Sequence, residues 1–151
     1  MHTLPRNVIH VALVAAASAS ALAAQGREAA RPRTDRGVEI SVVGVERASS
    51  AALGDCPPGA NTQRAMARAG EEFAIVTVAL AVIDPNAPGP VKRPVLIDAA
   101  GKSYNTAASF VDPSKTPASS CRFPFRIPAG IKLKALQIDS LRFDLTVLAS
   151  P

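Results

Sequence analysis

The sequence predicts an all-β fold, an antiparallel sandwich of about seven strands that follows a helical signal peptide. Three observations support this prediction. Short segments alternate apolar and polar residues at period two, Gly and Pro separate these segments, and helical periodicity is almost absent after residue 37. Short strands with this punctuation are typical of a sandwich, and a small barrel is the alternative.

Residues 1–23 have the layout of a secretory signal peptide. Arg6 supplies a basic start, and an uncharged run of Val, Leu, Ala and Ser follows it. Ala21 and Ala23 are the small residues that signal peptidase requires, so we expect cleavage after Ala23, with Ala24 as the next candidate. A retained membrane anchor is disfavoured because the run is short and rich in Ala. We therefore expect a periplasmic or extracellular protein without a stable membrane anchor.

The remaining chain divides into a tail and one domain. Residues 24–36 hold four Arg and no large apolar residue, so they are predicted to form a flexible basic tail. Residues 37–151 are predicted to form the β-sandwich domain. The net charge of the whole chain is +5, but 12 basic and 10 acidic residues from residue 37 onward leave only +2. A nucleic-acid partner is therefore not expected.

The first predicted strand covers residues 37–45. Its apolar positions change phase at Gly44, which predicts a β-bulge. The first apolar set is Val38, Ile40 and Val42, and the second, on either side of Gly44, is Val43 and Val45. Residues 48–61 are rich in small and turn-forming residues and are expected to form a loop. A short helix is expected from Asn61 or Thr62 to Ala69.

The segment Phe73–Ile83 is the most apolar of the chain and predicts a central strand. Six of its eleven residues are β-branched. Short strands are expected at residues 95–97 and around Tyr104, joined by turn-forming residues. Two loops rich in Pro, residues 84–94 and 111–120, separate these strands from their neighbours.

Three further strands are predicted at the C-terminal end, over residues 122–127, 131–138 and 141–147. In the first, alternation places three apolar residues opposite two Arg, and Pro124 predicts an edge strand or a bulge. The apolar residues are Phe123, Phe125 and Ile127, and the basic residues on the other face are Arg122 and Arg126. Aromatic residues beside Arg can also stack on nucleic acid, but the alternation favours a core role for the two Phe residues.

The two cysteines, Cys56 and Cys121, both lie outside the signal peptide. An exported protein meets an oxidising compartment, so this pair is predicted to form a disulfide. A redox or metal site is disfavoured because the chain lacks a Cys-x-x-Cys motif and both His residues leave with the signal peptide.

Three segments together resemble a family of immunoglobulin-like domains of bacterial secreted proteins and lipoproteins, a domain of unknown function. They are Gly70–Val78, Leu96–Tyr104 and Phe123–Gly130, of which the second carries the pattern D-x-x-G-x-x-Y. The resemblance implies a β-sandwich similar to that of a mycobacterial secreted immunoprotective antigen. The chain departs from the family at Val82, where Asn is common, and in lacking a lipid-anchor Cys. The family has no agreed activity, so the resemblance implies no site residues.

The mature chain offers little catalytic chemistry. It has no His, which excludes a Ser-His-Asp or Cys-His arrangement and a His-ligated metal. Carboxylates alone could form a catalytic pair or a calcium site, but their spacing matches no known ligand loop; the candidates are Glu71, Glu72, Asp98, Asp112, Asp139 and Asp144. We therefore expect no catalytic residue, no metal and no cofactor.

These observations favour a non-enzymatic binding or interaction domain outside the cytoplasm. Its partner is expected to be an unidentified protein or envelope component, recognised by loops 84–94 and 111–120, because sandwich folds carry function on the loops at their ends. The alternative is a structural accessory module of the cell envelope without a ligand of its own.

Overall fold

The computed structural model describes residues 31–86, 90–108 and 116–148. The predicted signal peptide, residues 24–30 of the predicted tail and Asp112 lie outside the described residues. In the described ranges every regular element is a β-strand. The strands are β1 (Arg33–Asp35), β2 (Val38–Ala48), β3 (Ser50–Ala52), β4 (Arg64–Met66), β5 (Glu71–Val82), β6 (Val95–Asp98), β7 (Ser103–Asn105), β8 (Ala118–Pro128), β9 (Leu133–Ile138) and β10 (Leu141–Asp144).

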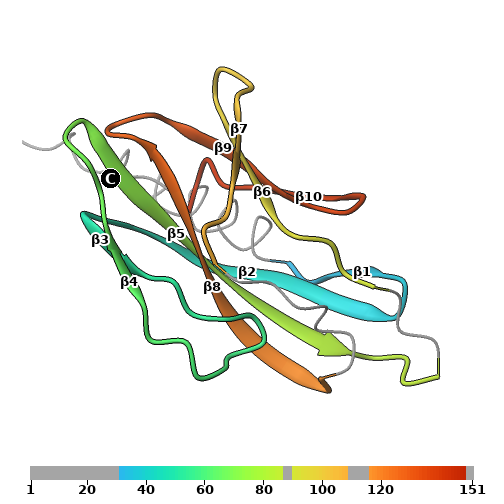
Figure 1. Cartoon of the computed structure of the whole chain (residues 1–151). Coiled ribbons are helices and arrows are strands. Elements are labelled where there is room, and N and C mark those ends of the chain that lie inside the picture. Colours follow the sequence, from blue (N-terminus) through green and yellow to red (C-terminus); the bar gives the residue numbers. More distant parts are fainter. Residues whose placement is uncertain (1–30, 87–89, 109–115, 149–151) are drawn as a thin grey trace, which may run out of the picture.

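The strands form two four-stranded sheets and a separate hairpin (Figure 1). One sheet has the order β1-β2-β5-β8, the other has the order β10-β9-β6-β7, and β3 pairs with β4. All these pairs are antiparallel. The predicted all-β antiparallel sandwich is confirmed. The seven predicted strands correspond to β2 and β5 to β10, and the other three are only 3 residues long.

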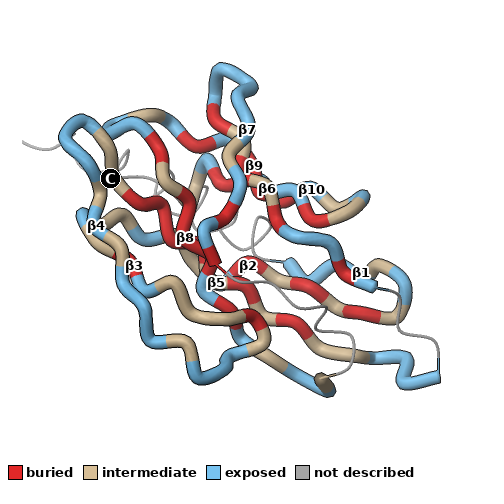
Figure 2. The backbone as a smooth tube through the Cα atoms, in the orientation of Figure 1, coloured by how far each residue is buried: buried red, intermediate tan, exposed pale blue. Residues whose placement is uncertain are grey.

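The core lies between the two large sheets. Figure 2 shows buried residues alternating with more exposed ones along β2, and Val38, Ile40 and Val42 are each only 1% exposed. From β8, the side chains of Phe123 and Phe125 fill the same core. The predicted core role of these two Phe residues is therefore confirmed, and Pro124 lies in an edge strand as expected.

A second, smaller apolar cluster lies on the outer face of the first sheet. Phe73 and Ile75 of β5 are buried there beneath Ala51 of the β3–β4 hairpin. The guanidinium carbon of Arg126 lies 4.8 Å from the centroid of the Phe73 ring. The N-terminal half of β5 is thus covered on both faces, as its nearly continuous apolar sequence requires.

The hairpin replaces the helix expected from residue 61 to residue 69. Residues 64–66 form β4, which pairs with Ser50–Ala52 of the expected loop. The helix prediction was wrong because small residues such as Ala51 and Ala65 pack closely over Phe73 only as extended strands. This tertiary contact outweighs the high helix propensity of Ala.

The predicted bulge in β2 is confirmed, but its side chains differ from expectation. The register with β5 shifts between Val42 and Gly44. Val43 is the extra residue and is 61% exposed, whereas Val45 is half-buried against the core. A similar shift in the pairing of β6 with β9 leaves Lys134 without an opposite residue, which explains the phase change within β9.

The first strand begins earlier than the predicted domain boundary at residue 37. Residues 33–35, which we expected in the flexible tail, form β1 and pair with Val38–Ile40 of β2. The connecting turn holds Arg36 and Gly37 at φ values of 45° and 74°. Two consecutive residues of positive φ are typical of a tight hairpin turn, and this local geometry overrides the polar composition of the segment. At the other terminus, β10 ends at Asp144 rather than at residue 147.

Within the described ranges no helix is long and apolar enough to span a membrane.

Candidate functional site

The first Pro-rich loop and the C-terminal end of the second are attached to the same end of the sandwich. The first loop joins β5 to β6 and the second joins β7 to β8. The end of β5 pairs with the start of β8, and the start of β6 pairs with the end of β7. The described parts of the two loops are residues 83–86, 90–94, 106–108 and 116–117. The first loop begins and ends beside the β1–β2 turn, and the second loop ends at the same place through Pro117, whereas its start at residues 106–108 lies beside Pro124 and Phe125 of β8.

The first loop is anchored to the body of the domain at both of its ends. The amides of Ile83 and Asp84 donate hydrogen bonds of 2.9 and 3.1 Å to the carbonyl oxygen of Gly37. At the other end, Val91 is buried in the core with 7% exposure. The amide of Lys92 then donates a 2.9 Å hydrogen bond to Asp139 Oδ2. These contacts fix the two ends of the loop on the sandwich.

The second loop is anchored to β8. The hydroxyl of Thr106 and the amide of Ala107 both donate to the carbonyl oxygen of Pro124, at 3.1 and 2.9 Å. Ala108 is buried, and its amide donates to Thr106 Oγ1 at 3.2 Å. The amide of Val82 donates to the carbonyl oxygen of Pro117 at 2.8 Å, which joins the end of this loop to β5.

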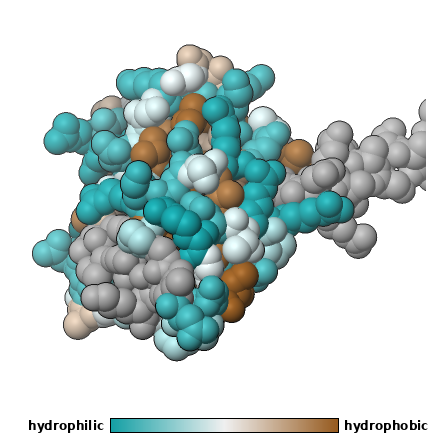
Figure 3. Space-filling model, turned by 90° about the vertical axis from the view of Figure 1, so that its right-hand side faces the viewer, coloured by the Kyte–Doolittle hydropathy of each residue, from teal (hydrophilic) through white to brown (hydrophobic). Residues whose placement is uncertain are grey.

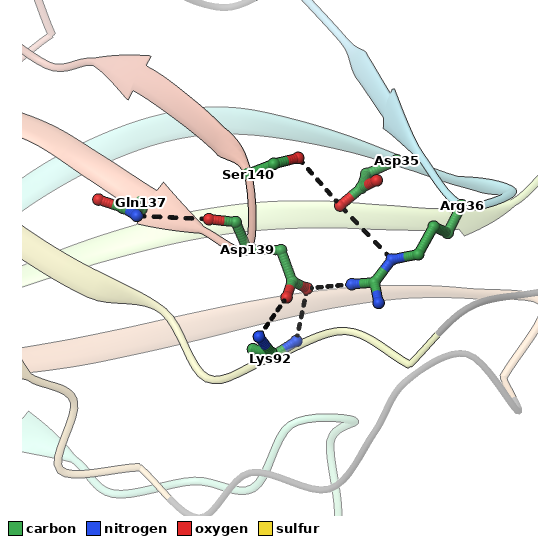
Figure 4. A network of polar contacts seen from close by, with 6 residues as sticks. All are labelled: Asp35, Arg36, Lys92, Gln137, Asp139 and Ser140. Carbon is green, nitrogen blue, oxygen red and sulfur yellow. Dashed lines mark hydrogen bonds and ion pairs between the residues drawn. The ribbon is translucent and has the colours of Figure 1, made fainter.

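The carboxylate of Asp139 connects three segments at this end (Figure 4). Asp139 Oδ2 lies 2.8 Å from the guanidinium of Arg36 in the β1–β2 turn and accepts the amide of Lys92 from the first loop. Its other oxygen lies 3.6 Å from Lys92 Nζ, and the Asp139 side chain is only 7% exposed. A carboxylate that interacts with this many donors serves to hold these three segments together, which disfavours a role in catalysis.

Figure 3 views the molecule from this end. Hydrophilic residues dominate the visible face, and the hydrophobic residues appear as separate spots rather than as one broad patch. Lys92 and Arg93 of the first loop are exposed and charged. The described part of this end therefore offers mainly polar contacts to a partner.

The candidate carboxylates do not form a common site. Glu71 and Glu72 are adjacent in β5, but Glu71 pairs with Arg126 at 3.1 Å, whereas Glu72 pairs with Arg47. The hydrogen bond from Arg126 lowers the pKa of Glu71 against the opposing effect of burial. Asp144 is at the end of β10, where hydrogen bonds from the amide and hydroxyl of Thr146 lower its pKa. Among the described residues no group of three or more His, Cys, Asp or Glu side chains could hold a metal ion.

Asp98 and Tyr104 explain the D-x-x-G-x-x-Y pattern in structural terms. The hydroxyl of Tyr104 and the amide of Lys102 each donate a 2.9 Å hydrogen bond to the buried Asp98 carboxylate. Gly101, at a φ of 86°, allows the turn between them. Burial opposes the charged form of Asp98, but these hydrogen bonds outweigh it and lower the pKa of the carboxyl. The pattern therefore stabilises the β6–β7 hairpin.

The predicted disulfide joins Cys56 to Cys121, whose Cα atoms are 5.4 Å apart. Both residues are 1% exposed. Cys56 lies in the loop between β3 and β4, and Cys121 lies in β8. The bond therefore attaches a long loop to an edge strand of the first sheet.

Two shallow hollows on the outer face of the first sheet were not predicted. The larger, of about 430 Å³, is lined by Glu39, Ser41, Ala79, Leu80, Ala81, Ala118, Ser119 and Ser120. The smaller, of about 210 Å³, lies under the disulfide loop and shares Ser120 with the first. Within the described ranges Ser119 Oγ is buried without a hydrogen-bond partner. The only signal in the sequence was Ala or Ser at alternate positions of two strands, which is also ordinary for a solvated sheet face.

No protein-family model matches the chain, and no curated protein matches its sequence. Among solved structures, the chain is similar to an uncharacterized β-sandwich protein from Clostridium difficile 630. The two are 10% identical, the match covers 75% of this chain and 87% of the other, and the TM-score is 0.47.

Proposed function

We propose that the protein is a non-enzymatic binding domain that works in the periplasm or outside the cell. Within this proposal the sandwich is of the immunoglobulin-like class, and loops 84–94 and 111–120 recognise a protein or another envelope component. The observation that carries the proposal is that both ends of the first loop and the C-terminal end of the second are fixed by hydrogen bonds at one end of the sandwich. Loops held by a rigid scaffold are the usual carriers of recognition in such folds.

Two further features support this proposal. The disulfide between Cys56 and Cys121 suits an oxidising compartment, as an exported protein would require. The described candidate carboxylates are each held by donors of their own, so none is available as a free acid or base; they are Glu71, Glu72, Asp98, Asp139 and Asp144.

The proposed address is tested by the mass of the native protein. Cleavage after Ala23 or Ala24 predicts a mature chain that starts at Ala24 or Gln25 and is recovered from a soluble extracytoplasmic fraction. Intact mass spectrometry of the purified native protein measures this start. Recovery of the full-length chain in the membrane pellet would contradict export as a soluble protein.

The proposed recognition is tested by replacing the loops. Residues 86–90 and 111–115 are replaced, separately, by Gly-Ser sequences of equal length, which leaves Asp84, Val91 and Pro117 in place. Envelope extract is then passed over the native protein and both variants. We expect partners retained by the native protein to be lost from at least one variant.

The matched control replaces Ala99 and Ala100, in the exposed turn at the opposite end of the sandwich, with Ser. This control should retain the same partners as the native protein. If both loop variants also retain every partner, loop recognition is wrong. If the native protein retains none, the structural accessory module becomes the better description.

A further inference from the structure

One edge of β2 is largely unpaired. β2 has 11 residues, but β1 pairs only with Val38–Ile40 at its start. Along residues 41–48 no other described strand lies on that edge, and the described chain supplies no backbone hydrogen bonds there besides those to β5. Every second residue of such an edge directs an N–H and a C=O group away from the sheet, so the edge can accept another strand.

The side of the sandwich next to this edge carries half-buried apolar residues. Val45 of β2 and Ile131 pack against the core without being fully covered. Arg47 of β2 donates a hydrogen bond to the carbonyl oxygen of Ile131, which places Ile131 beside the far end of β2. An added strand along β2 would cover part of this apolar surface with its inward side chains.

β2 presents little free charge to an added strand. Glu46 pairs with Arg122 at 2.6 Å across the sheet, and Arg47 pairs with Glu72 of β5. The bulged Val43, which is 61% exposed, adds an apolar contact on the outer face. The edge therefore favours an uncharged, apolar occupant.

We propose that the edge formed by residues 41–48 of β2 binds an extended segment of a partner protein, with apolar side chains at alternate positions, as an additional strand. Main-chain hydrogen bonds would supply affinity, and the alternate apolar side chains would supply specificity. This surface is separate from the two Pro-rich loops, so the proposal goes beyond the function proposed above.

The N-terminal tail of this chain is a poorer match than a partner segment. Its sequence from residue 24 to residue 32, AQGREAARP, holds two Arg, one Glu and no large apolar residue. It cannot present apolar side chains at alternate positions. The bulge at Val43 interrupts the row of hydrogen-bonding groups, and bulges of this kind limit uncontrolled pairing of edges. A reversible complex with a short segment is therefore expected rather than aggregation.

The test uses a synthetic peptide, Lys-Thr-Val-Thr-Val-Thr-Val-Thr-Val-Lys, added to the purified protein. Its Val residues alternate with Thr, and its terminal Lys residues keep it soluble. Backbone amide signals are followed by NMR, with hydrogen exchange as a second measurement. We expect saturable shifts centred on residues 41–48 and slower exchange of those amides that point away from β5. A peptide with its two central Thr residues changed to Pro should not bind, because Pro lacks the N–H donor.

The variant Val43→Lys places a charge on the edge at an exposed position and should weaken binding by at least about fivefold. Met66→Lys is the matched control because Met66 is 69% exposed on the β3–β4 hairpin. It should leave the affinity unchanged within about twofold.

Three outcomes would overturn the proposal. The first is the absence of peptide-induced shifts at residues 41–48 at millimolar peptide. The second is protection of the same amides in the free protein that disappears when residues 24–30 are deleted, which would assign the edge to the tail. The third is protection that depends on protein concentration, which would assign the edge to a second copy of the chain.

Discussion

The hydroxyl group of Tyr104 lies 2.9 Å from Asp98 Oδ2 and donates a hydrogen bond to it across the β6–β7 hairpin. Tyr104→Phe removes this donor and keeps the ring. We expect the melting temperature at neutral pH to fall by about 5 °C, since hydrogen bonds to charged groups are among the stronger ones. Thermal melts measure the change, and Ser103→Ala, at an exposed neighbour in β7, is the control. Equal melting of the Tyr104 variant and the native protein would contradict this role.

The same hydrogen bond predicts a dependence on pH. Its donors lower the pKa of Asp98 in the folded protein. A carboxyl with a lowered folded pKa stabilises the fold above its unfolded pKa, and this contribution is lost as the pH falls through the folded pKa. The difference in melting temperature between Tyr104→Phe and the native protein should therefore shrink in acid. A difference that grows as the pH falls would show that another group is responsible.

Asp139 is expected to hold the β1–β2 turn and the first Pro-rich loop in place. Asp139→Asn keeps a residue that tolerates the observed φ of 51° but removes the charge that pairs with Arg36. Asp139→Gly keeps the backbone conformation and removes every side-chain contact. We expect amide exchange at Lys92 to accelerate modestly in the first variant and strongly in the second. Unchanged exchange in the Gly variant would mean that the loop is held by other contacts.

Alternation in β10 predicts that substitutions at two adjacent residues lower the stability by very different amounts. Phe143 is 1% exposed, so Phe143→Asp would bury a carboxylate at a cost of several kcal/mol, comparable with the whole stability of a small domain. Asp144 is exposed, but it accepts hydrogen bonds of 2.8 and 2.7 Å from Thr146. Asp144→Ser should therefore cost only about 1 kcal/mol or less. Thermal melts separate the two, and similar melting temperatures would contradict the assigned phase.

The disulfide is expected to be a large part of the net stability. Cys56 and Cys121 are separated by 65 positions, and the chain-entropy model assigns a bridge of that length on the order of 4 kcal/mol. Cys56→Ser should lower the melting temperature by tens of degrees at most and leave Cys121 able to form dimers. Labelling of thiols in the native protein, with and without reductant, provides the check. Full labelling of both cysteines without reductant would exclude the bond.

Local sequence patterns predicted the fold where burial sets the pattern. Period-two alternation identified β2 and β8 because one face of each is packed in the core. It missed β1, whose polar residues 33–35 are held by a tight turn and by the bond from Arg33 to the carbonyl oxygen of Arg142. It also missed the β3–β4 hairpin, since nothing in an Ala-rich segment reveals that it will cover Phe73.

The candidate site shows the same limit. The two Pro-rich loops were visible as sequence, but the points at which they are attached to the sandwich depend on which strands pair. The role of Asp139 depends on three segments that meet only in the folded protein. Such contacts join residues far apart in the chain, and no local pattern encodes them.

The order of the strands has a consequence for how the protein folds. β5 lies between β2 and β8, and β9 lies between β6 and β10, so each sheet needs a strand from the last third of the chain. Folding dominated by such distant pairings is slow, commonly milliseconds to seconds. A chain emerging N-terminus first would leave one edge of the apolar β5 unpaired until β8 appears, because only β2 precedes it. During that interval the nascent protein is prone to aggregate, and a chaperone that shields β5 would raise the yield of folded molecules.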